Sequence, residues 1–159
     1  MTATPMLSDP DRFALRRVAA FLSSTTDPWW VLGSAAMALS GIDPGGIRDV
    51  DVLVSKRDAK ALMARHAWKN SADGGTERYR SAIFLMLDLG ERRVEIMAGY
   101  EIRAGDRWER VEPGTREPVK IDEAVLFVPS VEDQIAILRQ LGRPKDLARL
   151  ARFPDASSA

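Results

Sequence analysis

Two segments of the chain alternate apolar and polar residues, as half-buried strands do. Residues 49–54 read Asp-Val-Asp-Val-Leu-Val, and residues 93–97 read Arg-Val-Glu-Ile-Met. Successive side chains of a strand point to opposite faces, so each segment has one apolar and one polar face. Shorter apolar runs predict further strands around Val31, Ile83 and Leu126.

The second half of the chain contains less regular strand signals. We expect a long strand over 79–89, joined to 92–97 by a turn at Gly90-Glu91. Residues 100–117 are polar and contain Gly and Pro, which predicts a connecting loop. Residues 119–128 predict one further short strand.

Apolar residues recur at helical spacing in five other segments. Turn and cap residues mark their ends: Asp9-Pro10 opens the first, Ser130 and Gly142 bracket the fourth, and Pro144 opens the last. The predicted helices cover residues 10–24, 34–40, 56–67, 131–141 and 145–153. Together the patterns predict an α/β (α+β) fold, in which a mixed β-sheet is flanked by helices. We expect a single domain over 1–153 that ends in two helices, followed by a disordered tail over 154–159.

Composition narrows the class of protein. The 159 residues include 45% hydrophobic and 29% charged residues, which is typical of a globular domain. Lys plus Arg equals Asp plus Glu, at 23 each, so bulk charge does not indicate strong nucleic-acid binding. Cysteine is absent, which excludes disulfides, thiolate zinc sites and cysteine nucleophiles. No apolar run is long enough to span a bilayer, and we expect a cytoplasmic protein without a membrane partner.

The polar face of segment 49–54 carries the first candidate chemistry. Asp49 and Asp51 would lie side by side on one face of the strand, where their mutual repulsion favours a bound cation. Carboxylate oxygens suit Mg²⁺ or Mn²⁺. The preceding Gly33-Ser34 lies where a helix should begin, so its N–H groups and hydroxyl could hold a phosphate. Arg48 either meets a triphosphate or balances the two aspartates.

Gly33-Ser34, a short helix and then Asp49-Val50-Asp51 within an apolar strand resemble the nucleotidyltransferase superfamily with the DNA polymerase beta fold. The resemblance covers about residues 29–153 and is greatest to small bacterial members. These include the minimal nucleotidyltransferases and the toxin-side proteins of abortive-infection systems.

The resemblance implies further site residues. A third carboxylate comes from a neighbouring strand in this superfamily, and Val94-Glu95-Ile96 has the matching hydrophobic-acid-hydrophobic pattern. Aspartate is usual there, so Glu95 is one methylene longer. Asp88 is the rival third acid, unless it pairs with Arg93 across the hairpin. Lys145 either reaches the cleft phosphate or pairs at the surface with Asp146. Arg149 stands where the family commonly has an acid.

The implied function is metal-dependent transfer of a nucleoside monophosphate from an NTP to a hydroxyl acceptor on a protein, an RNA or a small molecule. Asp49, Asp51 and Glu95 would be the catalytic and metal-binding residues, with Mg²⁺ or Mn²⁺ as cofactor. Gly33, Ser34, Arg48 and Lys145 would bind the nucleotide. Two alternatives stay open. One is a catalytically degenerate nucleotide- or metal-binding protein, and the other is a toxin–antitoxin module with a protein partner.

Overall fold

A computed structural model describes residues 6–154, which form five helices and nine strands. The helices are α1 (Asp9–Leu22), α2 (Gly33–Leu39), α3 (Lys56–His66), α4 (Val131–Leu141) and α5 (Pro144–Leu150). The strands are β1 (Trp30–Leu32), β2 (Asp49–Val54), β3 (Tyr79–Arg80), β4 (Ile83–Leu89), β5 (Arg92–Ala98), β6 (Glu101–Ala104), β7 (Arg107–Arg110), β8 (Glu117–Ile121) and β9 (Ala124–Val128).

The predicted mixed sheet is confirmed. Four strands form the central sheet in the order β1-β2-β5-β4, with β2 and β5 parallel and the other pairs antiparallel. The turn at Gly90-Glu91 joins β4 to β5 as expected, because Leu89 and Arg92 are register partners. The strand near Leu126 does not join this sheet, since β9 pairs only with β8.

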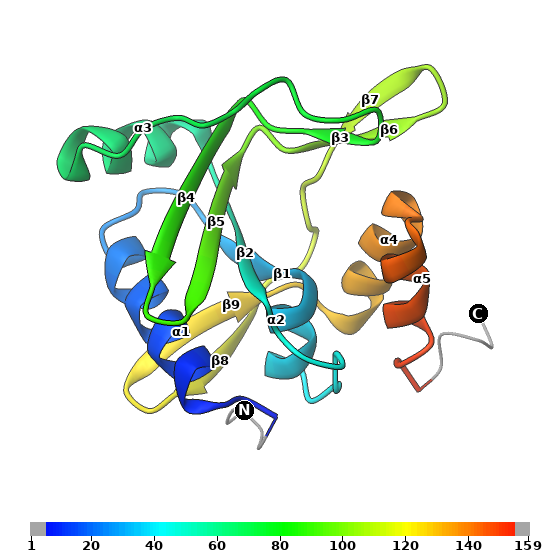
Figure 1. The fold of residues 1–159 in the computed structure, drawn as a ribbon, viewed down its shortest axis with the longest axis horizontal. Helices are drawn as coiled ribbons and strands as arrows, with labels where there is room; N and C mark the ends of the chain where they lie inside the picture. Colours follow the sequence, from blue (N-terminus) through cyan, green and yellow to red (C-terminus); the bar gives the residue numbers. More distant parts are fainter. Residues whose placement is uncertain (1–5, 155–159) are drawn as a thin grey trace.

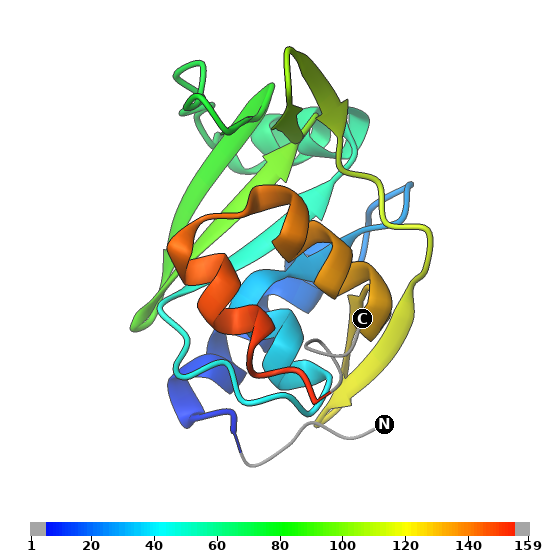
Figure 2. The same ribbon diagram turned by 90° about the vertical axis from the view of Figure 1, so that its right-hand side faces the viewer.

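The alternating pattern gives the central sheet two unlike faces. One face carries a continuous apolar row that includes Val31, Val52, Ile96 and Leu85, which are at most 1% exposed. Buried side chains of α1 and α3 belong to the same core cluster. The other face carries Asp51 and Glu95, and α4 and α5 lie on this side, to the right of the sheet in Figure 1 and in front of it in Figure 2. The apolar face therefore anchors the sheet and leaves the acidic face for a cleft.

Three further predictions about the strands were wrong. Residues 79–89 form two strands in different sheets, because the chain leaves β3 at Ser81 and enters β4 at Ile83. Residues 101–110 form the hairpin β6–β7 instead of a loop, and β3 pairs with β6. Residues 117–128 form the hairpin β8–β9 instead of one strand, because the chain turns at Asp122, whose φ is +53°.

The helix boundaries agree with the predictions to within a few residues, with two corrections. Ser8, and not Asp9, caps α1, since its hydroxyl accepts from the Asp11 N–H and the Asp11 carboxylate accepts from the Ser8 N–H. The last helix ends at Leu150, three residues before the predicted end. The predicted disordered tail lies outside the described residues except for Pro154. None of the helices in residues 6–154 has the length and apolar character needed to span a membrane.

Candidate active site

The three predicted carboxylates come together because β2 and β5 are parallel neighbours. The register places Asp51 opposite Glu95, and Asp49 lies two residues earlier on the same face. Leu32 of β1 is the other partner of Asp51, and Met86 of β4 is the other partner of Glu95. One row across the sheet therefore reads Leu32, Asp51, Glu95, Met86.

Gly33 turns the chain from β1 into α2 directly beside this row. Its φ of +65° lies in the left-handed region, which favours glycine. A Cβ at this position would lie 3.0 Å from Asp51 Oδ2, so only glycine lets the backbone approach the carboxylate this closely. No side chain at the N-cap position, Leu32, caps the start of α2, so its first N–H groups receive no side-chain cap there. The adjacent Ser34 is buried.

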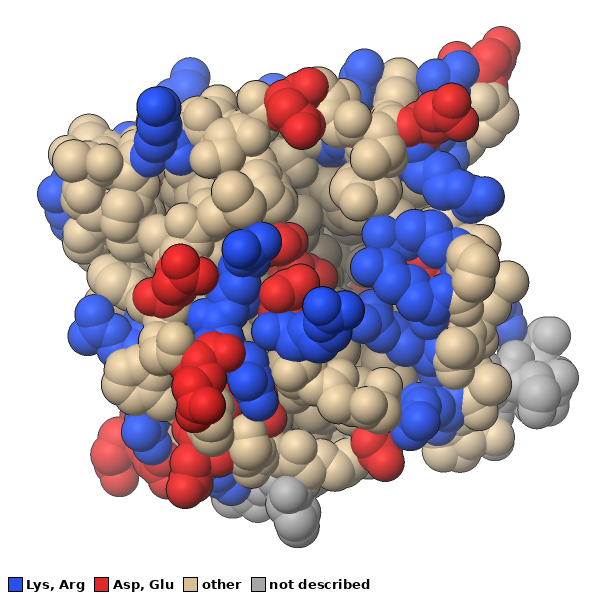
Figure 3. All heavy atoms as spheres, viewed as in Figure 1, with Lys and Arg blue, Asp and Glu red and all other residues tan. Residues whose placement is uncertain are grey.

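All of the predicted site residues line one cleft of about 530 Å³. They are Gly33, Ser34, Arg48, Asp49, Asp51, Glu95 and Lys145. The cleft lies between the acidic face of the sheet and the α4–α5 pair, and the loop at 71–76 forms a further side. Figure 3 shows this arrangement, with acidic side chains in the central hollow and Lys and Arg gathered beside it in the region of α4 and α5.

The cleft perturbs two of its carboxyl groups. Burial raises the pKa of Asp51 to about 7, and the charges of Glu95 and Asp49 act in the same direction, against Arg149 and Lys145. Burial also raises the pKa of Glu95, with Asp49 adding to the effect and Lys145 among the groups that oppose it. No hydrogen bond to the Asp51 carboxylate is formed within residues 6–154. Positive charge supplied from outside the chain would relieve this unfavourable arrangement.

The start of α5 brings positively charged side chains to the cleft. The structure also corrects the alternative that Lys145 pairs with Asp146. Asp146, which is fully buried, binds Arg143 through two nitrogen–oxygen contacts of 2.6 and 3.1 Å, so it is not the partner of Lys145. Lys145 is exposed on the cleft wall and acts electrostatically on both Asp51 and Glu95. Arg149, which departs from the family pattern, also lines the cleft and lowers the pKa of Asp51.

Two other residues, Asp88 and Gln134, differ from what the sequence predicts or were not predicted from it. Asp88 and Arg93 are register partners as expected, but no ion pair joins them within the described part of the chain. Gln134 lines the cleft, and its amide nitrogen donates to Ser40 Oγ and to the Pro129 carbonyl. Its buried Oε1 has no partner among the described residues. No local sequence signal marks Gln134, because its position depends on how α4 packs on α2.

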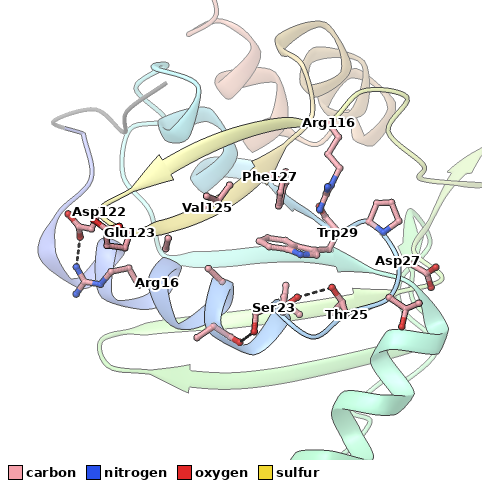
Figure 4. Close-up of a pocket in the computed structure, with 16 residues that line it drawn as sticks. Arg16, Ser23, Thr25, Asp27, Trp29, Arg116, Asp122, Glu123, Val125 and Phe127 are labelled. Atoms are coloured by element: carbon pink, nitrogen blue, oxygen red, sulfur yellow. Dashed lines mark hydrogen bonds and ion pairs between the residues drawn. The ribbon is translucent and has the colours of Figure 1, made fainter.

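A wider and shallower groove of about 930 Å³ lies between α1 and β9 (Figure 4). Its carboxylates are already engaged in part: Asp122 pairs with Arg16 at 2.7 Å, and Asp27 pairs with Arg57 at 2.6 Å. The Arg116 guanidinium lies 3.4 Å from the centre of the Phe127 ring. This groove lacks a row of adjacent carboxylates, so we assign the candidate chemistry to the cleft over the central sheet.

A divalent cation fits the donor chemistry of the cleft. Carboxylate oxygens are hard ligands, and burial together with the charges of Glu95 and Asp49 raises the pKa of Asp51 to about 7, so a bound cation would favour its charged form. However, no group of three or more Asp, Glu, His or Cys side chains within residues 6–154 is arranged to hold a metal ion. The acids therefore share a cleft without forming a finished coordination site, and a bound nucleotide could supply the missing ligands.

Comparison with solved structures identifies the fold. A candidate nucleotidyltransferase from Thermotoga maritima (TM1012) matches with a TM-score of 0.68 and 23% identity, over 88% of this chain and 89% of that chain. An antigenic nucleotidyltransferase-like protein from Paracoccidioides brasiliensis matches with a TM-score of 0.58 and 15% identity, over 96% and 78%. ANT(2")-Ia in complex with adenylyl-2"-tobramycin matches with a TM-score of 0.56 and 14% identity, over 92% and 87%.

No protein-family model matches the sequence, and a search of curated proteins finds no match. The structural matches nevertheless agree with one another. The chain has the fold of the nucleotidyltransferase superfamily, as its Gly-Ser and Asp-Val-Asp motifs predict.

Proposed function

We propose that the chain is a divalent-metal-dependent nucleotidyltransferase that moves a nucleoside monophosphate from an NTP to a hydroxyl acceptor. The observation that carries the proposal is the row formed by Asp51 and Glu95, with Asp49 on the same face and Gly33 packed against Asp51. Carboxylates crowded beside a sharp glycine turn suit a metal-bound triphosphate better than they suit a structural role. The fold of the chain is compatible with this chemistry.

Asp49 and Asp51 would hold Mg²⁺ or Mn²⁺, with Glu95 completing the acidic side of the site. When bound, the ion would neutralise charge on the triphosphate and lower the pKa of the acceptor hydroxyl. The backbone N–H groups at Gly33 and Ser34 would donate hydrogen bonds to the β- and γ-phosphates. Lys145 and Arg48 would add positive charge on the open side of the cleft, and Arg149 extends the same wall.

The reaction needs one proton acceptor. The acceptor oxygen attacks the α-phosphorus, the bond to the bridging oxygen of the β-phosphate breaks, and pyrophosphate leaves. Glu95 takes the hydroxyl proton and passes it to solvent. Its raised pKa supports this role, because a carboxylate with a higher pKa is the better base.

The test has a binding arm and a transfer arm. Thermal unfolding is measured with Mn²⁺ and each NTP, for the wild type and for Asp51→Asn. A ligand at a hundred times its dissociation constant adds about 2.7 kcal/mol to stability, so a clear rise in Tm is expected for the wild type alone. Transfer is then followed with α-labelled and γ-labelled NTP, and only the α label should reach an acceptor.

The outcomes separate the candidate functions. Stabilisation by nucleotide with no transfer of the α label to any acceptor tested would favour the degenerate nucleotide-binding protein. The longer Glu95 in place of the usual aspartate is the feature that keeps this second candidate open. No stabilisation by any NTP, with or without Mn²⁺, would contradict the proposal.

A further inference from the structure

Strand β4 forms an open edge of the central sheet next to the cleft. It is the last strand in the order β1-β2-β5-β4, and Figures 1 and 2 both show it at the outer margin of the sheet. Its sequence is Ile-Phe-Leu-Met-Leu-Asp-Leu, so Asp88 is its one charged residue and proline is absent. Proteins usually protect open edges with charges, proline or bulges, since unprotected edges recruit other strands.

The hydrogen-bond register shows which backbone groups of β4 are free. Antiparallel pairs alternate between hydrogen-bonded and non-hydrogen-bonded partners. Phe84 directs its backbone away from β5, because its N–H donates to Asn70 Oδ1 at 3.0 Å and its carbonyl accepts from the Ser71 N–H at 2.8 Å. By alternation, the N–H and C=O groups of Met86 and Asp88 also point outward. No hydrogen bond to another described residue is recorded for them.

The contacts at Phe84 show how a partner strand could hydrogen-bond to the outer edge of β4. Asn70 and Ser71 already bind the outer edge of β4 where the loop at 71–76 begins. Residues of this loop then line the cleft, and no other strand or loop within residues 6–154 hydrogen-bonds the outer edge of β4 beyond Phe84. An added strand could continue from this point along Met86 and Asp88.

Apolar side chains are exposed along the same edge. Met86 is 47% exposed and lines the cleft, and Phe13 of α1 is 43% exposed and packs against Gly90 at the end of the β4–β5 hairpin. Exposed large apolar side chains beside unpaired backbone groups are features of a surface that binds extended peptide.

We propose that the outer edge of β4, from Met86 to Asp88, is a docking surface for an extended segment of a partner polypeptide, which binds as a fifth strand of the central sheet. The residue opposite Met86 would extend the row Leu32, Asp51, Glu95, Met86 by one position. Its Cα would lie about 10 Å from that of Glu95, two strand spacings away. The bound segment would thus widen the cleft floor.

A second copy of the chain fits this edge less well. Two β4 strands pairing antiparallel about a two-fold axis would place Asp88 of one copy opposite Met86, Asp88 or Phe84 of the other, and the outward backbone groups of Phe84 are already bound by Asn70 and Ser71. The first arrangement sets a carboxylate beside an apolar side chain, and the second sets like charges opposite each other, which destabilises a sheet. A partner segment can instead offer a neutral or basic residue to Asp88.

Disulfide tethering tests the docking surface, because the chain has no cysteine of its own. The variant Met86→Cys is equilibrated in a thiol–disulfide buffer with the blocked pentapeptide Thr-Val-Cys-Val-Thr, and the linked fraction is measured by intact mass. The peptide is used in two forms with equal methyl counts. One form carries N-methyl groups on both valines, and the other carries them on the cysteine and the last threonine.

In the proposed register, the cysteine and threonine N–H groups face β4 and the valine N–H groups face away. We expect the valine-methylated peptide to have an exchange equilibrium constant at least ten-fold above that of the other form. Leu147→Cys on α5, where Leu147 is 55% exposed, is the control and should capture both forms equally.

Equal capture of the two forms by Met86→Cys, or the same preference by Leu147→Cys, would overturn the proposal. So would a wild-type dimer, detected by light scattering, that Met86→Lys converts to a monomer, because it would assign the edge to a second copy. None of these readouts requires nucleotide, so their failure is distinct from failure of the proposed transferase activity.

Discussion

Replacing Asp51 by asparagine should stabilise the metal-free protein while removing its response to metal and nucleotide. Burial in the folded protein raises the pKa of Asp51 from its ordinary value of 3.8 to about 7. A charged Asp51 is therefore disfavoured in the folded state. Asparagine has nearly the same shape and carries no charge, so it avoids this penalty.

The magnitude follows from linkage between folding and protonation. Between about pH 4 and pH 7 the folded state holds a proton on Asp51 that the unfolded state has released, so wild-type stability falls as the pH rises. A tenfold change in proton affinity corresponds to about 1.36 kcal/mol, so a rise in the pKa from 3.8 to about 7 gives about 4 kcal/mol at most. Water in the cleft screens part of this, and we expect Asp51→Asn to gain about 2–4 kcal/mol at pH 8. The gain should fall towards zero near pH 4.

Urea unfolding, followed by tryptophan fluorescence in EDTA from pH 4 to pH 8, measures the gain. Asp49→Asn is the matched control, because it neutralises an exposed carboxylate of the same strand and should change stability by less than about 1 kcal/mol. Added Mn²⁺ should stabilise the wild type at pH 8 and leave Asp51→Asn unchanged. A variant that is less stable than the wild type at pH 8, or a gain that does not depend on pH, would refute the reasoning.

Three further variants test separate parts of the site. Gly33→Ala should lower the free energy of unfolding in urea by about 1–2 kcal/mol and abolish stabilisation by nucleotide. Its control is Gly105→Ala, because Gly105 has a similar φ of +64° and open space around it. The control should show only the cost of placing alanine at a positive φ. Asp146→Ala should lower the unfolding free energy by about 3–5 kcal/mol, since it leaves a half-buried guanidinium unpaired. Asp122→Ala, which breaks an exposed ion pair, should cost less than about 1 kcal/mol. Glu95→Gln should reduce turnover more than the affinity for nucleotide measured by calorimetry, and equal losses would argue against its role as a base.

The local pattern was sufficient to predict which side chains of residues 49–54 and 93–97 face the candidate cleft, because these residues occupy regular strands. Alternation in residues 49–54 and 93–97 fixes which side chains share a face of the strand. The apolar side chains must pack against the core, so the acidic side chains point to the opposite face. The parallel pairing of β2 with β5 then brings Asp51 opposite Glu95. That pairing follows from the fold, which the resemblance supplied and the sequence pattern alone did not.

The hairpins β6–β7 and β8–β9 were missed for two physical reasons. Charged residues dominate β6 and β7, so the pattern lacks the apolar alternation that marks a strand. The β8–β9 turn is made by Asp122 and Glu123, and Asp122 adopts a positive φ that is more typical of glycine or asparagine. Without a Gly or Asn signal, the two strands resemble one long segment.

The places of Arg143 and Arg149 on the basic side of the cleft could not be predicted from local sequence. Arg149 stands where the family pattern expects an acid, yet in the folded chain it lines the cleft and lowers the pKa of Asp51. Arg143 and Asp146 lie three residues apart, and the choice between Arg143 and Lys145 as the partner of Asp146 depends on which side chain the folded cleft buries. Such contacts are set by tertiary packing.

The most direct test of the proposed function is a crystal structure with Mn²⁺ and a non-hydrolysable NTP, in which anomalous scattering locates the metal. We predict a manganese peak bound by Asp49 and Asp51, with the triphosphate against the Gly33-Ser34 turn and facing Lys145. A manganese peak away from both aspartates, or a triphosphate bound outside the cleft, would contradict the proposed site and the activity inferred from it.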